Sequence, residues 1–86
     1  MNVDRNPTNM RLTPAKRNIL AHMKYREQKI CVSTAPGVNL AWLPDYPGIV
    51  RIESVVSMIS NGFLIKDSGE AGIARYKLSP TADRRI

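Results

Sequence analysis

Few residues in this chain of 86 carry the chemistry that catalysis needs. His22 is the single histidine and Cys31 the single cysteine, and they fall on different predicted elements. The sequence contains no CxxC, HExxH, Gly-rich phosphate loop or carboxylate pair, so neither a metal site nor an activated nucleophile is expected. We expect His22 to pack beside an apolar helix face and Cys31 to act as a small core residue. The sequence therefore predicts a protein that is not an enzyme and that needs no cofactor.

The chemistry that the chain does offer is positive charge. Thirteen Lys and Arg residues against seven Asp and Glu residues give a net charge of +6. Such an excess favours an anionic partner, with nucleic acid first and an acidic protein surface second. Lys16 and Arg17 lie in the first predicted helix, and three more cations lie on a C-terminal hairpin. Because Arg75 and Lys77 alternate with apolar residues, we expect both to point outward, with Lys66 beside them in one patch.

The rest of the fold is expected to surround a helix over residues 51–62. Its apolar residues fall at i, i+3, i+4 and i+7, the spacing of one buried stripe. They are Ile52, Val55, Val56 and Ile59. Gly62 would end the helix, because glycine adopts the left-handed conformation without a steric penalty. We expect the stripe to pack against the first helix, with Phe63 or Leu64 and Tyr76 closing one side.

The opposite face of this central helix is polar. Its candidates for hydrogen bonds to base edges are Arg51, Ser54, Ser57 and Asn61. Hydroxyl and amide groups of these types can bond bases in the major groove. Glu53 on the same face would repel phosphates, and Met58 lies alongside. The pattern therefore predicts modest contacts to bases, with the grip on phosphate supplied by cations elsewhere in the chain.

Two further segments complete the N-terminal half. Residues 1–11 show no periodic apolar pattern and read as a disordered arm before one domain over residues 12–86. Thr13-Pro14 is a helix start, since threonine accepts from free N–H groups and proline suits the first helical position. The helix should run to about Gln28. One side of it carries Leu12, Ala15, Ile19, Leu20 and Met23.

The segment after the first helix allows two interpretations. Residues 30–34 are rich in β-branched side chains, and Pro36-Gly37 follows as a turn signal. Residues 38–43 are then either the second strand of a hairpin or a short helix. We favour the hairpin, because no residue that caps a helix well precedes Val38.

The C-terminal segment carries a family pattern. Tyr76-Lys77-Leu78-Ser79-Pro80-Thr81-Ala82 resembles the Tyr-x-Leu-Thr-x-x-Gly ending that closes the wing in many bacterial winged-helix regulators, although Ser79 replaces threonine and Ala82 replaces glycine. Leu12-Thr13-Pro14-Ala15 and Ile19-Leu20 are similar to the first helix of that superfamily. The resemblance spans Leu12 to Ala82. It implies a small α+β winged helix: helix, β-hairpin or short helix, helix and two-stranded wing. Small winged-helix proteins of prophages and mobile elements share this plan.

The resemblance implies transcriptional control by binding double-stranded DNA. In this hypothesis the wing and first helix grip phosphate, and the central helix contacts bases; a homodimer would suit paired half-sites. The DNA-contacting residues would be Lys16, Arg17, Arg51, Ser54, Ser57, Asn61, Lys66, Arg75 and Lys77. The alternative is a winged-helix interaction module, such as an inhibitor, an adaptor or a toxin–antitoxin component, that binds an acidic protein. Trp42, Tyr46 and Met58 would then anchor the interface.

The composition also bears on the compartment. No apolar run approaches 18 residues, and the N-terminus carries no signal-peptide pattern. A single cysteine rules out an intramolecular disulfide framework. We therefore expect a cytoplasmic protein with no membrane partner.

Overall fold

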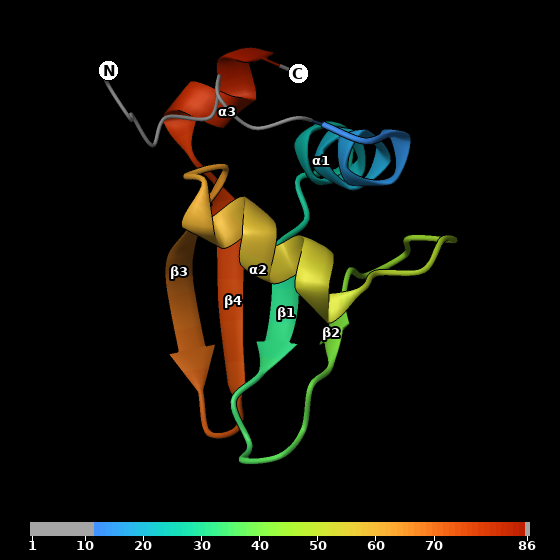
Figure 1. The fold of residues 1–86 in the computed structure, drawn as a ribbon. Coiled ribbons are helices and arrows are strands. Elements are labelled where there is room, and N and C mark those ends of the chain that lie inside the picture. The colour runs from blue at the N-terminus through green and yellow to red at the C-terminus, as the bar shows by residue number, and fades with distance from the viewer. Residues whose placement is uncertain (1–11, 86) are drawn as a thin grey trace, which may run out of the picture.

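The computed structural model describes residues 12–85 (Figure 1). The predicted arm over residues 1–11 lies outside the described residues. Within residues 12–85 the chain forms an α+β domain of three helices and four strands. In chain order these are α1 (Pro14–Arg26), β1 (Ile30–Ser33), β2 (Ala41–Trp42), α2 (Ile52–Ser60), β3 (Leu64–Glu70), β4 (Ile73–Leu78) and α3 (Pro80–Arg85). None of these helices is both long and apolar enough to cross a membrane.

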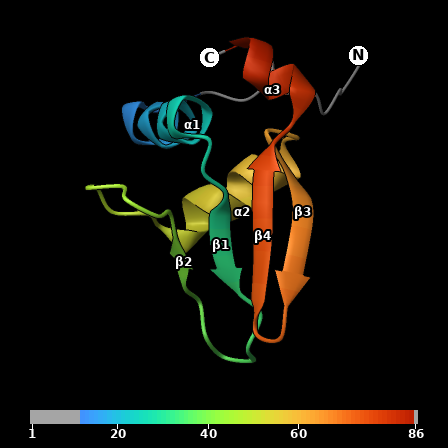
Figure 2. The same ribbon diagram turned by 180° about the vertical axis from the view of Figure 1, so that it is seen from behind.

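The strands form one antiparallel sheet in the order β2-β1-β4-β3. The helix α2 crosses one face of this sheet, while α1 and α3 lie beyond one end of the strands (Figure 1). The view from behind shows that none of the drawn helices covers the other face (Figure 2). We call the face under α2 the helix face, which from β1 and β4 carries Ile30, Val32, Ala74 and Tyr76. The other is the open face, which carries Cys31, Ser33, Arg75 and Lys77.

The predicted first hairpin is confirmed. Cys31 pairs with Trp42 and Val32 with Ala41 in antiparallel register. The backbone N–H of Ser33 also donates to the carbonyl of Leu40 at 2.9 Å. Residues 41–42 are therefore a strand and not part of a short helix, and a loop leads from them to α2.

That loop is fastened to α1 by a histidine. Nε2 of His22 donates to the Pro44 carbonyl oxygen at 3.0 Å. The His22 ring also meets the Tyr46 ring edge-on, with centroids 5.1 Å apart. His22 is half-buried, so it has the packing role expected of it. Tyr46, a predicted interface anchor, is instead engaged within the fold.

The first helix starts as predicted and ends earlier. Thr13 accepts a hydrogen bond from the Lys16 backbone N–H, and Pro14 takes the first turn. The helix ends at Arg26, because Glu27 adopts a left-handed conformation (φ 54°) and its N–H returns to the Met23 carbonyl. Ala15, predicted on the buried side, is exposed.

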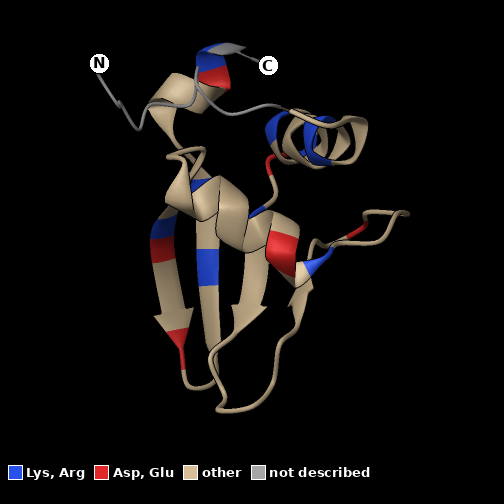
Figure 3. Ribbon diagram, in the orientation of Figure 1, with Lys and Arg blue, Asp and Glu red and all other residues tan. Residues whose placement is uncertain are grey.

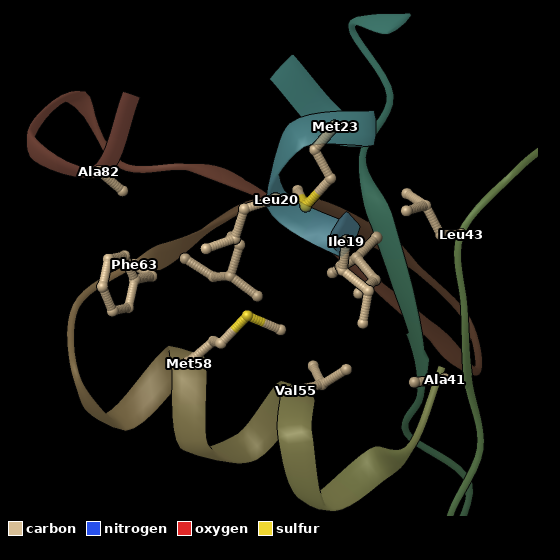
Figure 4. Packing of buried hydrophobic residues seen from close by; sticks show 11 residues of the cluster. Ile19, Leu20, Met23, Ala41, Leu43, Val55, Met58, Phe63 and Ala82 are labelled. Carbon is tan, nitrogen blue, oxygen red and sulfur yellow. The ribbon is translucent and has the colours of Figure 1, made fainter. Parts of the chain in front are cut away.

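The buried face of α2 differs from the predicted stripe. Val55 and Met58 are fully buried, Ile52 and Ile59 are partly buried, and Val56 is 53% exposed. Figure 4 shows Val55 and Met58 reaching from α2 toward the α1 side chains, with Phe63 closing one side. The prediction was therefore wrong for Val56, and wrong in treating Met58 as a surface anchor.

The connection at the end of α2 determines why Met58 rather than Val56 faces the core. The N–H of Phe63 donates to the Met58 carbonyl at 2.9 Å, so the chain turns directly from α2 into β3. Phe63 and Leu64 are buried at this point, as expected. The short connection fixes the orientation of α2, and the long, flexible Met58 side chain fills the space between α1 and Phe63.

Candidate nucleic-acid interface

Two predicted DNA-binding residues from different helices meet in the structure. Nζ of Lys16 donates to the Ser57 hydroxyl oxygen at 3.4 Å, and both side chains are half-buried. The contact follows from core packing, since Ile19 and Leu20 on α1 pack in the same cluster as Val55 on α2. Lys16 therefore places a positive charge beside α2. Arg17, its neighbour, is exposed, and its guanidinium donates to the Leu12 carbonyl at 3.5 Å.

The side chain of Asn61 is hydrogen-bonded to the backbone at the end of α2. Its side-chain amide donates to the Ser57 carbonyl at 2.8 Å, and its backbone N–H donates to the same oxygen at 3.0 Å. Both bonds satisfy a carbonyl that has no partner within the helix. Asn61 thus acts as a cap, and its NH2 group is committed to the backbone rather than free to read a base.

The outward face of α2 is left to other residues. Glu53, Val56 and Ser60 are exposed, and Arg51, directly before the helix, is exposed as well. Ser54 is half-buried. Sequence reasoning missed Val56, although a signal was present. With Met58, the nine residues of α2 contain five apolar side chains, more than a single buried stripe of this length needs.

The predicted cation patch on the β3–β4 hairpin does not form as one group. In the register of the hairpin, Lys66 stands opposite Tyr76 and Ile65 opposite Lys77. Directly paired residues point to the same face of a sheet. Lys66 therefore lies on the helix face, whereas Arg75 and Lys77 point to the open face. The expectation that Lys66 joins Arg75 and Lys77 in one patch was wrong, because the register pairs Lys66 with Tyr76.

The cations of the open face have carboxylate partners. Asp67 lies between two ammonium groups, with Lys29 Nζ at 2.7 Å and Lys77 Nζ at 3.7 Å. The hydrogen bond from Lys29, together with the charges of Lys29 and Lys77, holds the pKa of Asp67 below its ordinary value of 3.8. Arg75 pairs with Glu70 at 3.2 Å. These partners offset much of the positive charge on the open face.

A hollow of about 560 Å³ lies along the β3–β4 hairpin. It is lined by Thr34, Lys66, Asp67, Ser68, Gly69, Glu70, Ile73 and Ala74. At Gly69 a Cβ would come within 3.1 Å of the Ile73 carbonyl oxygen. The lining of the hollow therefore combines one lysine with the two carboxylates of Asp67 and Glu70.

The residues predicted to anchor a protein partner are not gathered on one surface. Met58 is buried in the core, and Tyr46 packs against His22. Trp42 is half-buried on the open face, opposite Cys31. The most exposed aliphatic side chains are instead Ile49 at 78% and Leu40 at 54%, together with Val56.

Residues 12–85 contain no group of three His, Cys, Asp or Glu side chains that could hold a metal ion. No protein-family model matches the chain, and comparisons with curated proteins and with solved structures likewise find no match.

Proposed function

We propose that this protein binds double-stranded DNA as a winged-helix domain, with α2 as the reading helix and the β3–β4 hairpin as the wing. The element order supports this plan. The helix α2 leads through Phe63 into the hairpin, and β1 pairs with β4 so that the strand order ends in β1-β4-β3. The departure from the usual plan is the segment between α1 and α2, where β2 and a loop replace a helix.

One observation carries the proposal: the distribution of charge between the two faces. Lys16, Arg51 and Lys66 come from three separate parts of the chain and lie beside α2, directly before it, and on the helix face of the sheet. Glu53 is the one acidic residue of α2. The open face, in contrast, pairs its three cations, Lys29, Arg75 and Lys77, with the two carboxylates of Asp67 and Glu70. Figure 3 shows the basic residues of α1 above α2.

The dimensions of α2 suit a groove of B-DNA. An α-helix with its side chains is roughly 10–12 Å across, which suits a major groove roughly 12 Å wide, and the nine residues of α2 give it a length of roughly 14 Å along the groove. With α2 in the groove, Lys16 and Lys66 would face phosphates on either side of it. Phosphate contacts of this kind position a protein without reading sequence.

The salt dependence of duplex binding tests this proposal. A fluorescein-labelled duplex is titrated with the protein and followed by anisotropy at 50 and 200 mM NaCl. Three phosphate contacts should weaken binding roughly 40-fold over this range, because each contact releases counterions. Absence of duplex binding at 50 mM NaCl would refute the proposal.

A second candidate function is binding of a protein, and the exposed aliphatic residues favour it. Ile49 lies just before α2 and Val56 lies on it, and both are exposed. The fully buried core of a protein interface is more apolar than the rest of the surface. In this case the Ile49→Ala variant would lose partner binding. The parent protein would show no salt-dependent affinity for duplex DNA.

A further inference from the structure

The centre of the outward face of α2 carries a valine. Val56 is 53% exposed, although it lies in the middle of a nine-residue helix. Glu53 and Ser60, both exposed, stand one turn away on either side at i−3 and i+4, so the three side chains are neighbours on the helix surface. An aliphatic side chain in this position contributes nothing to the core, which Val55 and Met58 already fill.

Two of the polar residues predicted to read bases, Ser57 and Asn61, are engaged within the fold. The Ser57 hydroxyl accepts from Lys16, and the Asn61 amide donates to the Ser57 carbonyl. Glu53 has no ion pair within residues 12–85. The exposed side chains of α2 are Glu53, Val56 and Ser60, so the groups nearest the centre of its outward face are the two methyl groups of Val56 and the carboxylate of Glu53.

These two groups fit pyrimidines. The C5-methyl of thymine is the apolar group that the bases present in the major groove, and aliphatic side chains contact it. A carboxylate accepts a hydrogen bond from the N4 amino group of cytosine. Guanine, in contrast, is read by Arg or Lys through its two acceptors. Residues 52–60 of α2 contain neither, and the exposed Arg51 lies before the first turn rather than beside Val56.

We infer that α2 recognises pyrimidines in the major groove, with Val56 against a thymine methyl group and Glu53 accepting from a cytosine amino group. This inference rests on the proposed function, because it requires α2 to enter the groove. It assigns sequence specificity to Val56 and Glu53 rather than to the predicted serine and asparagine residues of α2. Val56 would determine the preference at one base position.

Replacing thymine by uracil tests the role of Val56, because the two bases differ by the C5-methyl group alone. The preferred duplex is first selected from a random-sequence library at low salt, and each thymine is then replaced by uracil in turn. One replacement should weaken binding by the parent protein roughly three- to tenfold, the range expected for losing one buried methyl contact. The Val56→Ala variant should bind the thymine and uracil duplexes equally.

Two further variants distinguish the loss of a specific base contact from a general loss of folding or affinity. Val38→Ala removes an exposed valine distant in sequence from α2 and should keep the full preference for thymine. Glu53→Gln should shift the preference at a second position from cytosine toward adenine, since glutamine pairs with adenine. Duplex binding that is steeply salt-dependent but indifferent to uracil would overturn the inference and leave the proposed function standing. Absence of duplex binding would overturn both.

Discussion

Nζ of Lys16 on α1 lies 3.4 Å from the hydroxyl oxygen of Ser57 on α2. This contact joins the first helix, where most basic residues of the N-terminal half lie, to the helix that we propose reads DNA. The ammonium group of Lys16 on α1 therefore lies beside α2. In the proposed complex, Lys16 would supply the positive charge that α2 lacks, since the one charged residue of α2 is Glu53.

The two halves of the α2 surface should differ sharply in their importance for stability. Met58→Ala removes a fully buried side chain at the junction of α1, α2 and Phe63. It should lower the free energy of unfolding by roughly 2–5 kcal/mol. Val56→Ala, at a 53% exposed position, should change it by less than about 0.5 kcal/mol. Urea denaturation followed by circular dichroism measures both values. A larger loss of unfolding free energy for Val56→Ala would contradict the observed burial of Met58 and exposure of Val56.

The cap of the last helix offers a second stability test. Ser79 is buried, and its hydroxyl oxygen accepts the N–H of Ala82 at 3.1 Å at the start of α3. Ser79→Ala should cost roughly 0.5–2 kcal/mol, the usual penalty for losing such a cap. Ser79→Thr keeps the oxygen and should retain more of the stability, provided that the added methyl group fits the buried site. Equal thermal midpoints for Ser79→Ala and the parent would show that the cap contributes nothing.

The elements of this fold could largely be predicted from local sequence. Thr13-Pro14 marked the start of α1, and Pro36-Gly37 separated the two strands of the first hairpin. The extents of α2 and β4 followed from apolar spacing and from Gly62. These features depend on capping, turn chemistry and periodicity, which operate within a few residues.

The orientation of side chains could not be predicted in the same way. Five apolar residues on a short helix allow two overlapping stripes, and the tight connection through Phe63 selects the one that buries Met58. The face occupied by Lys66 depended on which residue stands opposite it on β4, a long-range property. An irregularity between Lys66 and Ser68 further shifts the register. Such features arise from tertiary packing and are absent from any single segment.

Asp67 should make stability depend on pH in the acid range. Lys29 and Lys77 hold its pKa below 3.8 in the folded protein, so the folded state binds fewer protons than the unfolded state as pH falls through this range. Its contribution to stability is therefore complete above pH 3.8 and is lost as pH falls through the lower, folded-state pKa. Thermal midpoints measured between pH 7 and pH 2 should show this loss, and Asp67→Asn should reduce it. An NMR titration that places the Asp67 pKa above 3.8 would contradict the ion-pair geometry.

We propose that the side of the molecule that carries α2, rather than the open face of the sheet, meets the phosphates of duplex DNA. Two double variants with the same loss of charge test it: Lys16→Ala with Lys66→Ala on the α2 side, and Arg75→Ala with Lys77→Ala on the open face. Circular dichroism first establishes that both variants are folded.

The decisive measurement is duplex affinity by anisotropy across a series of salt concentrations. We expect the Lys16→Ala, Lys66→Ala double variant to flatten the slope of log affinity against log salt concentration by about two units, close to one for each lost phosphate contact. The Arg75/Lys77 pair should leave that slope unchanged. An equal or larger effect of the Arg75/Lys77 pair would contradict the account, as would a parent protein with no affinity for duplex DNA.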